Sequence, residues 1–274
     1  MSYKVLNENT EFKIDDTAYF GDNVTFGKNC KKVEIGKGCF IGSDIYIDCD
    51  YLTIGDFSTI HHGSVVHGIN TTIGHNCWFG HYTIIDSVGG KTIIGNNVGV
   101  GAHSQLWSHM KFGDVLEGCR WNSAGRLILE DDVWLVGRSM TGPIHAKKKS
   151  MLMAGGIAVK NMDENCIYAG SPAKDVTEKF GNQFKERSLD EKKQMFLAYC
   201  EEYASQGGDV SSIELVDDFD VEKSKNGISQ FNLQNRTYYP CNSKNEFGFI
   251  KFMLYEKAKF LPFGREVVSP LGAN

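Results

Sequence analysis

A six-residue repeat constrains the fold of this chain more than any other feature. In its first two thirds, glycine or aspartate follows an aliphatic or aromatic residue at short regular intervals. These pairs are Ile14-Asp15, Phe20-Gly21, Phe26-Gly27, Ile35-Gly36, Ile41-Gly42, Ile47-Asp48, Ile54-Gly55, Ile73-Gly74, Phe79-Gly80, Ile94-Gly95 and Val100-Gly101. Fixed short periods are typical of solenoids. Each unit predicts one short strand and one turn, with the large residue inside and glycine permitting the turn.

A longer period is superimposed on the short one. Gly36, Gly55 and Gly74 are spaced 19 residues apart, so three hexapeptides and a small insertion make one coil. We expect the insertions around Tyr51 and at residues 68–71 to bulge at a corner of the solenoid.

Residues 110–125 break the repeat, which resumes in two further coils at 129–141 and 151–159. A solenoid needs no such excursion for its own stability, and long excursions from a regular scaffold are usually functional. We therefore expect a β-helix domain at residues 1–179 with an extruded loop at 110–125.

The remainder, residues 180–274, loses the repeat and is expected to form a small helical or mixed α/β appendage. Ser188 and Glu191 form a capping-box pattern at the start of one predicted helix. The expected elements are helices at 188–204 and 244–259 and strands at 213–216 and 237–239. No chemical motif stands out here, so this part is interpreted as a cover for the solenoid end, an oligomerisation element or part of a substrate site.

Composition excludes several classes of protein. The formal net charge is −5, and the longest basic run is Lys147–Lys149, so a nucleic-acid partner is not expected. No run approaches the roughly 20 apolar residues of a membrane span, and the first ten residues do not resemble a signal peptide, which favours a cytoplasmic protein with no membrane partner. The eight cysteines contain no C-x-x-C pair, which argues against a disulfide framework or a cysteine–zinc site.

Three segments, in order, carry a resemblance to a known family. They are Ser104-Gln105-Leu106-Trp107-Ser108-His109 before the loop, Leu129-Glu130-Asp131-Asp132-Val133-Trp134-Leu135-Val136-Gly137 after it, and Ile167-Tyr168-Ala169-Gly170-Ser171-Pro172-Ala173-Lys174 at the end of the repeat. From about Ile73 to Lys174 the chain resembles the hexapeptide-repeat acetyltransferases, which include the maltose, galactoside and serine enzymes and many sugar N-acetyltransferases. The resemblance implies a left-handed parallel β-helix, a homotrimer with active sites between subunits, and acetyl-CoA as co-substrate without a metal.

Acetyl transfer requires the acceptor to lose a proton, and histidine suits a general base near neutral pH. His109 is our choice among the eight histidines, because it begins the excursion and coincides with the base of the family. The coil register also places Asp48, His67 and Asp86 in one column. A carboxylate beside an imidazole raises its basicity, so His67 is an alternative base.

The acceptor is expected to be a sugar, favouring an amino sugar on a nucleotide as in polysaccharide biosynthesis, with N- or O-acetylation left open. His81 falls where the family contacts its acceptor, and Asp86 is a plausible partner. Trp107 and Trp121 offer rings for stacking on a sugar or a base.

Acetyl-CoA needs a groove with little side-chain bulk, which the small residues after Met153 and Tyr168 offer. The expected cofactor-binding residues are Trp134, Ala154, Gly155, Gly156, Ala169, Pro172 and Lys174. Lys147–Lys149 and Lys174 are candidates to meet the phosphates.

Two other functions remain open. His62 and His67 have the H-x4-H spacing of the γ-class carbonic anhydrases, whose zinc needs three histidines, but no histidine precedes His61 to supply the third. A non-catalytic trimeric scaffold would leave His109 and the loop unexplained.

Overall fold

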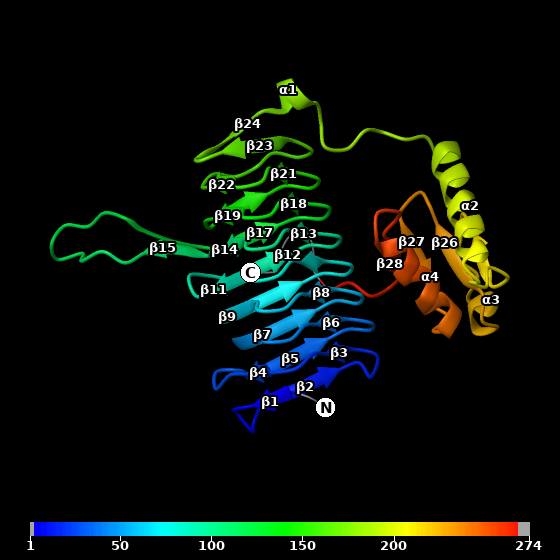
Figure 1. The fold of residues 1–274 in the computed structure, drawn as a ribbon, viewed down its shortest axis with the longest axis horizontal. Helices are drawn as coiled ribbons and strands as arrows, with labels where there is room; N and C mark the ends of the chain where they lie inside the picture. The colour runs from blue at the N-terminus through cyan, green and yellow to red at the C-terminus, as the bar shows by residue number, and fades with distance from the viewer. Residues whose placement is uncertain (1–2, 268–274) are drawn as a thin grey trace. The chain divides into compact units, whose positions relative to one another are not determined.

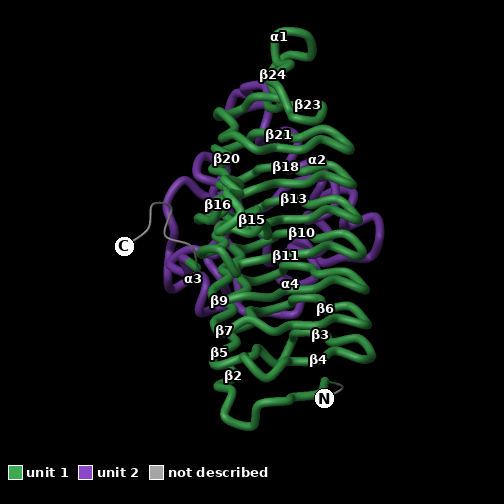
Figure 2. Tube along the Cα trace, turned by 90° about the vertical axis from the view of Figure 1, so that its left-hand side faces the viewer, with its two compact units in different colours: residues 1–184, 267–274 green, residues 185–266 purple. Residues whose placement is uncertain are grey.

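Residues 3–267 are described by the structure, a computed structural model. The chain divides into two compact units (Figure 2): the described residues up to Phe184 together with Val267, and Lys185–Glu266. The change in composition indicated a division after residue 179 instead.

The first unit is a stack of coils (Figure 1), and each full coil contributes one strand or half-strand to each of three faces. Face 1 contains β1 (Tyr3–Val5), β4 (Val24–Phe26), the first half of β7 (Tyr46–Ile54), the first half of β9 (Val65–Ile73), β11 (Ile84–Ser87), β14 (Gln105–Leu106), β19 (Met140–Thr141) and β22 (Ile157–Ala158). Face 2 contains β2 (Glu11–Ile14), β5 (Lys32–Ile35), the second halves of β7 and β9, β12 (Thr92–Ile94), β17 (Leu127–Leu129) and β20 (His145–Ala146).

Face 3 contains β3 (Tyr19–Phe20), β6 (Phe40–Ile41), β8 (Thr59–Ile60), β10 (Trp78–Phe79), β13 (Gly99–Val100), β18 (Trp134–Leu135), β21 (Met151–Leu152), β23 (Ile167–Gly170) and β24 (Ala173–Asp175). Neighbouring strands from successive coils are parallel, except that β23 pairs with β24 in antiparallel fashion. The short helix α1 (Thr177–Phe180) follows β24.

The hexapeptide pattern explains the core. The large residue of each central unit points inward, and Phe26, Phe79 and Val100 are fully buried. Small residues fill the space beside them, and several satisfy their own polar groups: the Ser58 hydroxyl, for example, donates to the Gly74 carbonyl at 2.8 Å. A Cβ on Gly101 would lie 2.2 Å from the Gly137 nitrogen of the next coil, so glycine is required where coils approach this closely.

The prediction that the insertions around Tyr51 and at residues 68–71 bulge at a corner is wrong. There β7 and β9 continue as nine-residue strands that run from face 1 to face 2. Their residues pair in register through the corner, for example Tyr51 with Asn70. Because consecutive coils carry similar insertions, the ladder of backbone hydrogen bonds continues where a lone insertion would interrupt it.

The second unit packs helices and a sheet around its own aromatic core. Its elements are α2 (Leu189–Ser205), β25 (Ile213–Leu215), α3 (Val221–Lys225), β26 (Ser229–Asn232), β27 (Thr237–Tyr239), α4 (Lys244–Leu254) and β28 (Leu261–Pro262). The capping box between Ser188 and Glu191 is present. The second predicted helix ends at Leu254, earlier than expected. The sheet has the order β25-β26-β27-β28, in which β25 and β27 were predicted and β26 and β28 were not.

The fold class is confirmed: a parallel β-helix of hexapeptide coils with an extruded loop and a small mixed C-terminal part. Among the helices of residues 3–267, none is both long and apolar enough to cross a membrane.

Candidate active site

The excursion is a hairpin arm, defined as residues 109–124, that leaves the corner between faces 1 and 2 (Figure 1). Its strands β15 (His109–Lys111) and β16 (Asn122–Ala124) are antiparallel. Ser108 fixes its base, because its carbonyl accepts from the Gly125 backbone at 3.0 Å and its hydroxyl accepts from the Gly89 backbone at 2.8 Å. His109, the first residue of the arm, is thereby held against the solenoid.

Asp86 lies at the centre of this corner. It follows the inward-facing Ile85 on β11, so its side chain points outward, yet it is 0% exposed. Oδ1 accepts hydrogen bonds from the Ser108 hydroxyl at 2.6 Å, the Ser108 backbone at 3.0 Å and His109 Nδ1 at 2.9 Å. Oδ2 accepts from the Val88 backbone at 3.2 Å. A buried carboxylate with this many donors is firmly placed.

These contacts decide the charge of Asp86. Burial opposes ionisation, but the hydrogen bonds from Ser108, His109 and Val88 together outweigh it and lower the pKa of the Asp86 carboxyl. Asp86 is therefore an anion near neutral pH. A ring nitrogen that faces an anion must carry a proton, so His109 donates through Nδ1, and in the neutral ring Nε2 keeps its lone pair.

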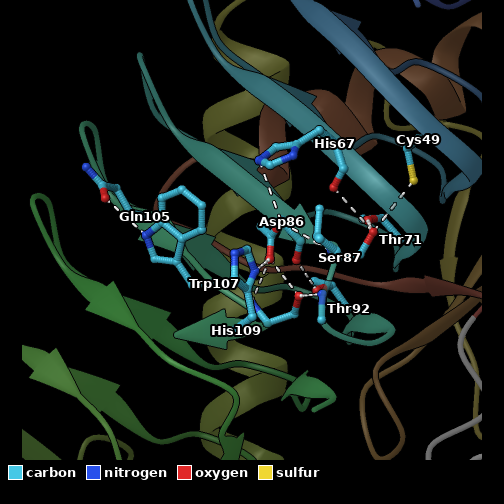
Figure 3. Close-up of polar contacts among 12 residues, drawn as sticks. Cys49, His67, Thr71, Asp86, Ser87, Thr92, Gln105, Trp107 and His109 are labelled. Carbon is cyan, nitrogen blue, oxygen red and sulfur yellow. Dashed lines mark hydrogen bonds and ion pairs between the residues drawn. The ribbon is translucent and has the colours of Figure 1, made fainter. Parts of the chain in front are cut away.

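His67 and Trp107 complete the cluster (Figure 3). His67 Nε2 lies 3.6 Å from Asp86 Oδ2, and the two residues are direct cross-strand partners on β9 and β11. The Trp107 indole stands edge to face with both imidazoles, with centroids 6.2 Å from His67 and 5.8 Å from His109. Its Nε1 donates to Gln105 Oε1 at 3.1 Å, which fixes the ring.

The pair formed by Asp86 and His109 can perform general base catalysis. The carboxylate orients the ring and stabilises the imidazolium that forms when Nε2 takes a proton. The predicted column of Asp48, His67 and Asp86 is present as backbone partners, but the shorter contact of Asp86 is with His109. The geometry thus favours His109 over His67 as the base.

A hollow at the C-terminal end of the β-helix has a chemistry suited to phosphate. It is lined by Ala158, Lys160, Asn161, Tyr168, Ala173, Lys174 and Asp175. Lys160 follows β22 at the same corner from which the arm departs, two coils further along the stack. Lys147, by contrast, is paired with Asp163 at 2.8 Å.

The other residues expected to bind acetyl-CoA are not among those that line this hollow. Trp134 is on face 3 beside Gly99, where an added Cβ would lie 3.3 Å from the indole. Ala154 and Gly155 are exposed at the corner between faces 3 and 1, where Gly156 is buried, and Ala169 follows the strand segment of the neighbouring coil that pairs with Met151 and Leu152. The chain therefore brings Lys174 to the hollow with Lys160 and separates Trp134 and Ala154–Gly156 from the corner that holds His109.

His81 and Trp121 lie outside the Asp86 cluster. His81 is at the corner between faces 3 and 1, whereas Asp86 is at the opposite end of face 1. Trp121 is exposed on the arm, together with Phe112 and Leu116. Of the expected acceptor-binding residues, the structure brings Asp86 and Trp107 to His109.

His61, His62 and His81 form a cluster whose ring nitrogens lie within 4.8 Å of one another. The Ser43 backbone donates to His62 Nδ1 at 2.7 Å, so the neutral His62 ring carries its proton on Nε2 and has no free lone pair for a metal. Burial, followed by the charges of His81 and His62, lowers the pKa of His61. In this tautomer the cluster lacks the three lone pairs of a catalytic zinc site, and His67 lies with Asp86 instead.

Comparisons with known proteins give structural matches only. No protein-family model matches the chain, and no curated protein matches it. The polysialic acid O-acetyltransferase OatWY is 20% identical with a TM-score of 0.48, over 69% of this chain and 95% of that protein. The polySia-specific acetyltransferase NeuO is 17% identical with a TM-score of 0.44, over 75% of this chain and 98% of that protein. A maltose O-acetyltransferase from Clostridium difficile 630 is 23% identical with a TM-score of 0.33, over 46% of this chain and 71% of that protein.

Two residues that the structure places at these sites, Ser108 and Lys160, were not predicted from the sequence. Ser108 donates twice to Asp86, and its only sequence signal is its position directly before His109. Lys160 lines the hollow with Lys174, and counting coils from β14 to β22 would have placed it at the corner of the arm.

Proposed function

We propose that this protein is an acetyl-CoA-dependent acetyltransferase in which His109 is the general base and Asp86 positions it. The observation that carries the proposal is the 2.9 Å hydrogen bond between His109 Nδ1 and the buried Asp86 carboxylate. His109 Nε2 removes the proton of the acceptor hydroxyl or amine as its oxygen or nitrogen attacks the thioester carbonyl carbon. The carbon–sulfur bond then breaks, and the proton passes from His109 to the departing sulfur, giving free CoA and the acetylated acceptor.

Acetyl-CoA is proposed to lie along the corner between faces 1 and 2. The arm departs after β14, and Lys160 follows β22, so two coil steps separate them, or about 10 Å at the usual strand spacing. With the thioester at His109, the phosphates would extend toward Lys160 and Lys174. Gly142, between these two points, adds no side chain to the corner, and the Met110 side chain of the arm lies beside it.

A sugar is proposed as the acceptor, with a nucleotide-linked amino sugar of polysaccharide biosynthesis as the favoured class. The Trp107 ring beside both imidazoles supports this, because an indole edge and face suit the mixed polar and apolar surface of a sugar. Both an amine and a hydroxyl are compatible with a histidine base.

A homotrimer is proposed as the working form. Within one chain, Trp134 and Ala154–Gly156 lie on other sides of the β-helix from His109. A neighbouring copy would bring them to that corner. Large apolar side chains on the arm, among them Phe112 and Leu116, are exposed and would be covered by such a neighbour.

Release of free thiol from acetyl-CoA tests the activity directly. The purified protein is incubated with acetyl-CoA and, in turn, nucleotide amino sugars, simple sugars and serine. We expect thiol release with at least one sugar and a mass increase of one acetyl group in that sugar. Release with serine alone would overturn the sugar assignment, and no release with any acceptor would overturn the activity.

Lys160→Ala and Lys174→Ala are each expected to raise KM for acetyl-CoA about tenfold with little change in kcat, since each removes a positive charge from the phosphates. The measurement is steady-state kinetics at saturating acceptor. Lys147→Ala is the matched control, because that charge is already paired with Asp163. Unchanged KM in both hollow variants would contradict this placement of the phosphates.

A further inference from the structure

Two histidines share one carboxylate at the proposed active site, and only one of them is needed as the base. His109 bonds to Oδ1 of Asp86, and His67 faces Oδ2 at 3.6 Å. They come from different parts of the chain, His109 from the arm and His67 from the middle of β9. The role of His67 is therefore a separate question.

The charge of Asp86 sets the tautomer of both rings. Since the carboxyl is ionised, it favours a proton on each nitrogen that faces it: Nδ1 of His109, which is hydrogen-bonded to it, and Nε2 of His67, 3.6 Å away. The outer nitrogens, Nε2 of His109 and Nδ1 of His67, then hold lone pairs. In the neutral state the site thus presents two hydrogen-bond acceptors.

Both imidazoles are accessible to a ligand. The His67 side chain is 32% exposed and the His109 side chain 22% exposed, while Asp86 between them is 0% exposed. The Trp107 indole contacts both rings edge to face (Figure 3). A flat or gently curved molecule that rests on Trp107 would therefore meet both outer nitrogens.

We propose that His67 binds the acceptor, and that its Nδ1 accepts a hydrogen bond from a second hydroxyl of the sugar ring whose first hydroxyl or amine is deprotonated by His109. This inference rests on the proposed acetyl transfer and narrows its substrate. The acceptor carries a second hydroxyl on the ring that bears the acetylated group, because the two histidines beside Asp86 present two acceptors. A simple amine or an isolated alcohol fills only one of them.

The cost of an unfilled His67 is modest. Loss of a hydrogen bond at a partly exposed site weakens binding about two- to tenfold. Its loss is expected in KM and not in kcat, since the bond forms in both the ground state and the transition state.

The test uses the best sugar of the thiol-release panel and its monodeoxy derivatives, each lacking one ring hydroxyl that is not acetylated. For the wild-type protein we expect one derivative to show a KM about tenfold higher, and the others to behave like the parent. In His67→Ala, the parent sugar should show that same higher KM. The sensitive derivative should have the same KM in His67→Ala as in the wild type. His67→Gln, whose amide oxygen also accepts a hydrogen bond, should restore part of the discrimination.

His103→Asn is the matched control, since His103 is an exposed histidine stacked on Tyr82, and asparagine tolerates its positive φ. This variant should give the wild-type KM for the parent sugar and for every deoxy derivative.

The outcomes separate the two proposals. A wild-type series with no sensitive hydroxyl, or a penalty of equal size in wild type and His67→Ala, would overturn the role of His67 and leave the acetyltransferase proposal intact. A loss of turnover by about 10²–10⁴ in His67→Ala with every sugar would make His67 the base instead. If no sugar accepts acetyl, the proposed sugar acceptor fails and this inference fails with it. The wild-type series remains informative even if a variant does not fold.

Discussion

His109→Ala is expected to lower kcat by about 10²–10⁴, the range for losing a positioned general base. The variant should still bind acetyl-CoA, because the hollow with Lys160 and Lys174 is formed by other coils. Turnover is measured with saturating acetyl-CoA and acceptor, and CoA binding by a thermal shift.

Comparable turnover of His109→Ala and the wild type would refute the assignment. The base would then be sought first at His67, which lies on the other oxygen of Asp86. His103→Asn again serves as the control for a histidine away from the site.

Asp86→Asn is expected to lower kcat by about 10² or more, since an amide can hold His109 in the wrong tautomer and does not stabilise the imidazolium. The substitution keeps the volume of the side chain, so the hairpin arm should stay in place. The measurement is kcat at several pH values. Asp163→Asn is the matched control, because that carboxylate is exposed and paired with Lys147.

The stability of the protein provides a second readout for Asp86. Its folded-state pKa is lowered, so ionised Asp86 stabilises the fold above its unfolded pKa of about 4. That contribution is lost as pH falls through the lower folded pKa. The difference in Tm between wild type and Asp86→Asn should therefore shrink as the pH is lowered below about 4. A Tm difference independent of pH would show that Asp86 is not an anion in the folded protein.

The repeat predicted the solenoid because a six-residue period permits few packings. Phe79 and Val100 occupy the inward places that their position before glycine indicated. The column of Asp48, His67 and Asp86 also followed from counting residues, since parallel coils stack equivalent positions.

The contact between Asp86 and His109 did not follow from that count. The arm has no period, and its first residue reaches Asp86 because Ser108 bonds to Gly89, Gly125 and the carboxylate itself. These bonds depend on the path of the chain at one corner, which no short pattern specifies.

The expected acetyl-CoA residues were grouped by motif order, and motif order does not report the face of a three-sided coil. Trp134 and Lys174 belong to resembling segments and both lie on strands of face 3, yet only Lys174 lines the hollow. Lys160, which belongs to no motif, lines the hollow with Lys174. Predicting which residues line the hollow would have required the register of each residue along the coils.

The stacked coils also limit how this site can change in evolution. The separation between the corner that holds His109 and the hollow that holds Lys160 is set by β19 and β22, which are hydrogen-bonded to the coils on either side. A duplication or deletion there would alter that separation only in whole steps of one strand spacing, about 4.8 Å. Gain or loss of coils before β7 would leave it unchanged. Under the proposed placement of acetyl-CoA, the number of coils before β7 can therefore change without effect on the site, whereas the number of coils between the arm and the hollow has to match the length of the ligand.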